Sequence, residues 1–227
     1  VSGHGVASAL VAIRLAQHFN PRDLARNIAF EAGPGGARRA RPPHEVVADL
    51  NRLFLAGDTH DLYFTIAYGL LDLASGALSL CQAGHAPAAI LSPEGKVRFA
   101  SLGGPPVGLI PDAAFRTDQT RLAPGERLLL YSDGITEAAV PDGAMLGEAG
   151  FARILARHAG LAFSEFLPQV LAEIDASTGG PDYSDDLSVV TVEMPDASSR
   201  GRLPRRRAAR NDPPLAQAAG SNASKCA

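Results

Sequence analysis

A block of strand-like sequence lies between two helix-like regions, and this order limits the chain to few fold classes. Residues 62–131 alternate with the two-residue period of strands, and a last strand-like run covers 187–193. Helical spacing of apolar residues occurs in four segments: 6–19, 43–55, 150–158 and 164–176. Helices, consecutive antiparallel strands, helices and a closing strand together predict an α+β layered sandwich.

Local signals mark the boundaries of these segments. Pro43 predicts the start of the second helix, because proline is favoured in the first helical turn. Residues 31–43 are rich in glycine, proline and arginine and predict a loop. Ser164, followed by the acidic Glu165, predicts an N-cap for the last helix.

The length of 227 residues predicts one domain and a tail. Apolar residues make up 46% and aromatic residues only 6%, so the core should be aliphatic. We expect a domain in residues 1–195 and a disordered tail rich in Arg, Pro and Ala in 196–227. The tail has seven basic and two acidic residues, a net charge of +5. Because the whole chain has a net charge of −3, the domain must have a net charge of −8. An acidic domain argues against nucleic acid as the main partner.

Cysteine usage and hydropathy predict a cytoplasmic protein. Cys81 and Cys226 form neither a disulfide framework nor a zinc pattern. No apolar run approaches the ~18 residues of a membrane span, and the first residues do not resemble a signal peptide. The chain lacks an initiator Met and starts in a turn that leads into a helix, so we expect it to be the middle of a longer gene product.

The strongest chemical signal is the pair Asp133-Gly134, which follows the apolar run 128–131. A buried strand that ends in this way holds a carboxylate where hydrolases that use hard metal ions place a ligand. Gly134 would let the backbone turn tightly beside it. The same dipeptide is also ordinary turn chemistry.

A second carboxylate signal is Asp185-Asp186, just before the closing strand. Adjacent carboxylates are costly there unless they are solvated or bind a cation. If the strands that end at Tyr131 and begin at Leu187 are neighbours, Asp133 and Asp185 meet at one sheet edge. Oxygen ligands without a His/Cys cluster suit Mg²⁺ or Mn²⁺ better than Zn²⁺. An acidic turn without a metal is the alternative.

Three glycine-containing turns complete the candidate site. His4 stands between two glycines ahead of the first helix, whose N–H groups favour anions such as phosphate, although a simple capping turn fits as well. His85 follows a glycine that interrupts a strand, and we favour a structural role for it. Residues 103–108 have three glycines but no following Lys-Ser/Thr, so they predict a structural loop near the site and not a P-loop.

In this order, these segments resemble the SpoIIE/RsbU-type serine/threonine phosphatases, the bacterial branch of the PP2C-like (PPM) metal-dependent phosphatases. The resemblance covers about residues 1–193 and rests on Val1-Ser-Gly-His-Gly-Val-Ala-Ser-Ala, Tyr63-Phe-Thr with Tyr68-Gly-Leu-Leu-Asp, Ala83-Gly-His-Ala-Pro, Gly103-Gly-Pro-Pro-Val-Gly, Leu128-Leu-Leu-Tyr-Ser-Asp-Gly-Ile-Thr-Glu-Ala and Asp185-Asp-Leu-Ser. The family fold is an α-β-β-α sandwich of antiparallel sheets flanked by helices, and this chain should lack its first strands.

The resemblance implies two Mn²⁺ or Mg²⁺ ions whose bound water attacks phosphorus, so no side chain receives a catalytic role. Asp133 and Asp185 match metal ligands of the family. The backbone carbonyl of Val1 matches a position that some relatives offer to a metal. The residues expected to support the site are Gly3, His4, Gly5, His85, Gly134 and Asp186.

One departure from the family pattern lies at the start of the chain. In the family, the turn that contains His4 is preceded by Asp-Val, and that Asp bridges both metals, whereas this chain starts at the Val. A further upstream ligand segment is also missing. We therefore expect this chain to be weakly active or inactive with Mn²⁺, and an upstream-extended chain to turn over a phosphopeptide much faster.

The resemblance also implies a substrate and partners. The expected reaction is hydrolysis of phosphoserine or phosphothreonine on an anti-anti-sigma (STAS-type) regulator, in bacterial partner-switching signalling. An N-terminal sensor or receiver module, absent from this chain, would control the phosphatase. No membrane partner is expected. Whether the protein forms a homodimer is left open. Three alternatives remain: a non-catalytic PPM-like binding module, a nucleic-acid role for the Arg-rich tail, and a metal phosphoesterase for small esters.

Overall fold

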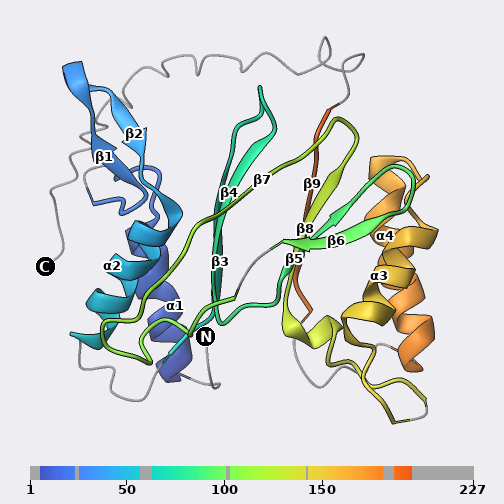
Figure 1. The fold of residues 1–227 in the computed structure, drawn as a ribbon. Helices are drawn as coiled ribbons and strands as arrows, with labels where there is room; N and C mark the ends of the chain where they lie inside the picture. Colours follow the sequence, from blue (N-terminus) through green and yellow to red (C-terminus); the bar gives the residue numbers. More distant parts are fainter. Residues whose placement is uncertain are drawn as a thin grey trace, which may run out of the picture.

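Two antiparallel sheets stack face to face between two pairs of helices (Figure 1). The computed structural model describes residues 6–23, 26–56, 63–100, 103–141, 143–180 and 187–195. The helices are α1 (Val6–His18), α2 (Pro43–Leu55), α3 (Gly147–Arg157) and α4 (Phe163–Thr178), with 3-10 turns η1 (Pro34–Gly36) and η2 (Asp133–Ile135). The predicted α+β sandwich is confirmed.

The strands form one hairpin and two sheets. They are β1 (Phe30–Ala32), β2 (Arg38–Ala40), β3 (Ile66–Leu71), β4 (Ala77–Ala83), β5 (Ala88–Leu91), β6 (Val97–Ala100), β7 (Asp118–Arg121), β8 (Arg127–Tyr131) and β9 (Val189–Glu193). One sheet has the order β3-β4-β7 and the other the order β6-β5-β8-β9. In Figure 1, α1 and α2 cover the first sheet, and α3 and α4 cover the second.

Side-chain alternation along β8 connects two of the three apolar cores. Leu128 and Leu130 belong to the cluster between the sheets, together with residues of β4 and β5. Leu129 and Tyr131 point to the other side and pack with α3 and α4. The third core joins α1 and α2 to β4, where Cys81 and other residues of that strand are buried. The period of two that predicted these strands therefore also sorts their residues among the cores.

Two expectations about local structure were wrong. Residues 31–43 are not only a loop, because Phe30–Ala32 pairs with Arg38–Ala40 in an antiparallel hairpin. Most of this hairpin is solvent-exposed, so its sequence lacks the apolar alternation that would have revealed it. Ser164 is not the N-cap of α4, since the helix begins one residue before it and the amide of Phe166 bonds to the carbonyl of Ala162.

Among the described residues, no helix combines the length and apolar character that crossing a bilayer requires.

Candidate functional site

Asp133 lies at the first position of η2, directly beyond the end of β8. Ser132 keeps an extended backbone, and the next residues curl into the 3-10 turn, in which Gly134 and Ile135 are buried. The turn is closed by bonds to the Asp133 carbonyl from the Thr136 hydroxyl (3.1 Å) and the Glu137 amide (2.9 Å). The backbone of Asp133 is thus fixed, while the residue itself is exposed.

Gly134 does not act as the sequence suggested. It is not among the residues with positive φ, so the turn uses a helical backbone that other residues can adopt. Glycine's wider conformational range is not required here. The burial of Gly134 and Ile135 anchors the turn instead.

The pairing of β8 with β9 places the start of β9 next to the end of β8, where Asp133 follows. The two strands are antiparallel neighbours, with Tyr131 opposite Val189. Beyond this pair, the amide of Ser132 donates to the carbonyl of Ser188, and the amide of Ser188 donates to Oγ of Ser132, both at 2.9 Å. The condition for a shared sheet edge, neighbouring strands, is therefore confirmed. Asp185 and Asp186 lie outside the described residues, so their meeting with Asp133 stays a prediction.

The N-terminal part of the candidate site also lies outside the described residues. Val1, Gly3, His4 and Gly5 precede α1, which starts at Val6 as the sequence predicted. The roles assigned to these four residues stay predictions.

His85 belongs to a turn that is packed against the Gly-Pro loop. Its Nδ1 donates to the carbonyl of Ala86 at 3.0 Å, a contact consistent with a structural role. Gly84 has a φ of 67°, and its amide donates to the Gly104 carbonyl at 2.7 Å. A Cβ at Gly84 would come within 2.7 Å of Pro106 Cγ, so only glycine fits there. The loop from Gly103 therefore has a fixed path.

Asn51 on α2 is a second anchor of this loop, and sequence reasoning missed it. Its side-chain amide donates to the Ile110 carbonyl at 2.9 Å and accepts from the Gly108 amide at 2.7 Å. Asn51 is only 2% exposed. The available signal was a polar residue on the apolar side of a helix, between Leu50 and Phe54.

The donor set that the structure describes is suited to a hard cation but incomplete. The Asp133 carboxylate has no hydrogen-bond or ion-pair partner among the residues with described positions. An exposed carboxylate oxygen suits Mg²⁺ or Mn²⁺. Within the described ranges, no group of three or more His, Cys, Asp or Glu side chains is arranged to hold a metal. A complete site would need the carboxylates predicted outside those ranges.

Tyr131, two residues before Asp133, closes the core behind the turn. Its ring contacts that of Phe151, with 4.6 Å between centroids. Burial, and to a smaller extent the charge of Glu148, raises the pKa of its hydroxyl well above the ordinary value. The phenol therefore stays neutral and serves packing.

Comparison with known proteins gives a consistent set of matches. The family described as Stage II sporulation protein E (SpoIIE) matches residues 1–195. Protein IcfG of Synechocystis sp. is 31% identical over 131 residues, 58% of this chain and 20% of IcfG. Phosphoserine phosphatase RsbP of Bacillus subtilis is 28% identical over 141 residues, 60% of this chain and 32% of RsbP. The chain thus spans between a fifth and a third of these relatives.

Solved structures identify the fold as PP2C-like. The PP2C domain of SiaA from Pseudomonas aeruginosa has a TM-score of 0.68 at 19% identity, covering 85% of this chain and 72% of that one. The RsbU and RsbW domains of a Mycobacterium tuberculosis protein give 0.64 at 23% identity, covering 85% and 49%. The Mn-presoaked phosphatase domain of Bacillus subtilis SpoIIE gives 0.50 at 16%, covering 86% and 75%.

Proposed function

The chain belongs to the SpoIIE family, and we propose that it is a metal-dependent phosphatase that hydrolyses phosphoserine or phosphothreonine in a protein. The observation that supports it is the β8–β9 pairing, which puts Ser188, three residues after Asp185 in the sequence, beside Ser132, the residue before Asp133. Similarity to a relative named phosphoserine phosphatase supports the reaction class.

In this proposal Asp133 and Asp185 hold two Mn²⁺ or Mg²⁺ ions, with the Val1 carbonyl as a further ligand. When bound, such ions generate a nucleophile from water and offset the negative charge of the phosphoryl group. One of the similar structures is a SpoIIE phosphatase domain presoaked with Mn, which supports the choice of metal.

The role of the chain's own residues is to position the ligands. Burial of Gly134 and Ile135 fixes the backbone of the turn that carries Asp133, and the two Ser132–Ser188 bonds hold the ends of β8 and β9 together. A rigid support of this kind reduces the reorganisation that metal binding would otherwise require. Asp186, His4 and the glycines beside His4 are proposed to support the same site.

Replacing Asp133 with asparagine tests the proposal. Asp133→Asn keeps the shape of the side chain but removes its charge, so Mn²⁺ affinity measured by calorimetry should fall roughly 100-fold, and turnover of a phosphoserine peptide should fall with it. Glu165→Gln, an exposed carboxylate at the start of α4, is the matched control and should change neither quantity. Unchanged Mn²⁺ affinity in Asp133→Asn would contradict the assignment.

For the substrate we propose a phosphorylated anti-anti-sigma-like (STAS-type) protein. Similarity to RsbP and to a structure that contains RsbU and RsbW domains supports this choice. A protein substrate offers binding energy away from the phosphate, so kcat/KM should be roughly 100-fold higher for a phosphorylated STAS domain than for p-nitrophenyl phosphate under the same Mn²⁺. Equal values would favour a phosphoesterase of small esters, and Mn²⁺-independent binding without turnover would favour a non-catalytic module.

A further inference from the structure

A cavity of about 420 Å³ lies between the end of α1, the start of β1 and the middle of α2. Its lining includes the apolar side chains of Ile28, Phe30 and Leu53. It also includes the basic side chains of His18, Arg26 and Arg52. The volume falls within the range of about 300–1,000 Å³ that is typical of small-molecule sites.

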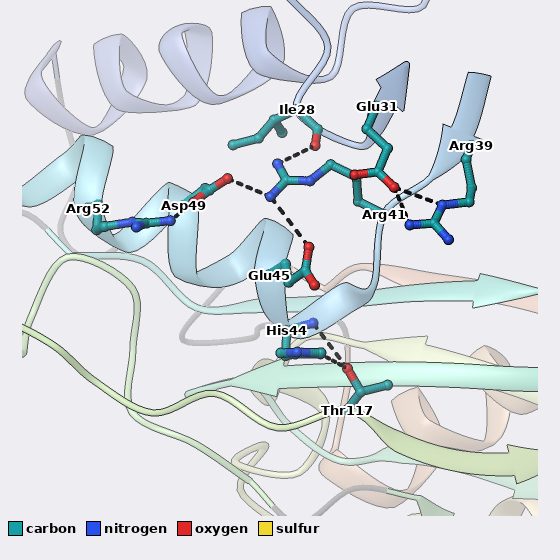
Figure 2. Close-up of polar contacts among 9 residues, drawn as sticks. All are labelled: Ile28, Glu31, Arg39, Arg41, His44, Glu45, Asp49, Arg52 and Thr117. Carbon is teal, nitrogen blue, oxygen red and sulfur yellow. Dashed lines mark hydrogen bonds and ion pairs between the residues drawn. The ribbon is translucent and has the colours of Figure 1, made fainter. Parts of the chain in front are cut away.

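A network of polar contacts holds the walls of this cavity in place (Figure 2). The guanidinium of Arg41 donates to the Ile28 carbonyl at 3.2 Å and pairs with the Asp49 carboxylate at 2.7 Å. Asn27, which is 6% exposed, donates to the carbonyl of Asn20 and accepts from the amide of Ala29. These contacts fix the chain at Asn27 and Ile28 and the carboxylate of Asp49 before any ligand arrives, which lowers the entropy cost of binding.

The charges around the cavity favour an anion. Asp49 is the one carboxylate in the described lining, and it already faces the guanidinium groups of both Arg41 and Arg52. Residues 18–56 contain six arginines and four carboxylates, a net charge of +2, within a domain whose charge is −8. The Arg26 side chain is 87% exposed, and its contact with Asp23 at 3.8 Å is of the solvent-exposed kind that contributes little.

We propose that this cavity binds a small amphiphilic anion. The charged group of the ligand pairs with Arg26 and Arg52, because guanidinium groups bind carboxylate, sulfonate and phosphate oxygens with charge-assisted hydrogen bonds. Its apolar part covers Phe30 and Leu53, whose exposed fractions are 39% and 41%. No residue of the proposed phosphatase site takes part, so the two proposals can fail separately.

Two fluorescent dyes test the proposal directly on the 227-residue chain. Anilinonaphthalene sulfonate is an anion with an aromatic body, and phenylnaphthylamine has the same body without the charge. The anionic dye should bind saturably at one site, with NMR shift changes at the amides of Ile28, Phe30 and Leu53. The uncharged dye should bind at least roughly 10-fold more weakly, since it lacks the partner of the guanidinium groups.

Variants separate this site from general dye binding. The double change Arg26→Gln and Arg52→Gln should raise the Kd of the anionic dye roughly 10-fold or more. Leu53→Glu should abolish binding, because it places a carboxylate against the ligand. Arg153→Gln, which removes an exposed arginine from α3, is the matched control and should leave the Kd unchanged.

The proposal is overturned if both dyes bind equally well, if the double arginine variant binds like the parent, or if the shift changes fall on α3 and α4. Thermal melting followed by circular dichroism checks that each variant is folded. Should Leu53→Glu fail that check, the double arginine variant, whose side chains lie at the surface, still decides the question.

Discussion

The two helical layers of the sandwich are attached to their sheets in different ways. The layer formed by α3 and α4 packs mainly through a continuous apolar core, in which Phe151, Phe166 and Leu155 are fully buried, and Arg127 of β8 adds a hydrogen bond to the Leu161 carbonyl. The layer formed by α1 and α2 also has an apolar centre, but polar contacts surround it. Examples are Arg41 with Asp49 and His44 with Thr117, whose hydroxyl is 2.8 Å from the imidazole.

This difference indicates that the two helical layers have different roles, one mainly in stability and the other mainly in positioning. Apolar burial is non-directional and scales with area, so it supplies most of the stability but tolerates small shifts. Hydrogen bonds are directional, so they contribute less energy and define positions. We expect α3 and α4 to dominate the free energy of unfolding, and α1 and α2 to hold the Gly-Pro loop and the cavity in place.

The largest expected effect is on the apolar layer. Phe166→Ala should lower the free energy of unfolding by about 4 kcal/mol, because it leaves a cavity at a fully buried position. It also removes the ring that lies 4.5 Å from the Arg127 guanidinium. Phe163→Ala in the same helix, at a position that is 46% exposed, is the control and should cost less than about 1 kcal/mol. Urea unfolding measures both, and similar losses would contradict the comparison.

Two arginines, one in each layer, test whether a buried ion pair contributes more to the free energy of unfolding than a peripheral one. Arg127 pairs with Glu193 and donates to the Leu161 carbonyl, both at 2.7 Å, and its side chain is 8% exposed. Arg127→Met should therefore cost about 3 kcal/mol, since partners in a buried setting are left unsatisfied.

Arg41→Met is the matched change on the other layer. We expect a loss of about 1 kcal/mol, because Asp49 retains Arg52 as a partner. The same urea titrations report both variants. A larger loss of unfolding free energy for Arg41→Met than for Arg127→Met would contradict the expectation that the α3–α4 layer contributes more to stability.

The third prediction concerns the positioning role of Asn51. Asn51→Ala should cost about 2 kcal/mol, because the Gly108 amide and the Ile110 carbonyl both lose their partner. Hydrogen exchange at the Gly108 amide should accelerate more than exchange in β8. Leu53→Ala, at a position that is 41% exposed on the same helix, should leave the Gly108 amide protected. Unchanged exchange at Gly108 in Asn51→Ala would show that the loop has another anchor.

The smallest expected effect is a pH dependence at the centre of the α1 and α2 layer. Burial, and secondarily the charge of Asp118, raises the pKa of the Cys81 thiol to about 11. In the unfolded chain the thiol ionises near its ordinary pKa of about 8.5. Below that pH the thiol is neutral in both states, and its contribution to the free energy of unfolding is fully present. As the pH rises from about 9 to 11, the free energy of unfolding should fall by about 1–2 kcal/mol. Cys81→Ala should remove that part of the slope, and an unchanged slope would mean that the thiol is hydrated.

Much of the fold could be predicted because burial and sequence period coincide in the central strands. The apolar run 128–131 was expected to end a buried strand, and it forms all but the first residue of β8, which stops at Tyr131. The β1–β2 hairpin could not be predicted in this way. Its strands are mostly exposed, and its pairing depends on backbone bonds such as that from the Gly33 amide to the Ala37 carbonyl.

The candidate site could be predicted only in part. Asp133 was found because it follows a buried strand, and the adjacency of β8 and β9 agrees with that reasoning. Its neighbour Gly134 suggested a special turn, yet the turn is helical, because sequence alone does not separate flexibility from burial. Asn51 was missed since its partners are backbone groups 57 and 59 residues away, which no local pattern reveals.

Strand β8 lies between two apolar cores and contributes side chains to both. This limits how the Asp133 carboxylate, which follows the strand, can move. Successive residues of β8 alternate between the inter-sheet cluster and the α3–α4 cluster. A slip of one residue would turn Leu129 and Tyr131 away from their helices and Leu128 away from the opposite sheet. Both cores therefore specify the same register of β8, which determines where the strand ends and where Asp133 follows it. Changes in the position of the Asp133 carboxylate would then come from the turn η2, which follows β8.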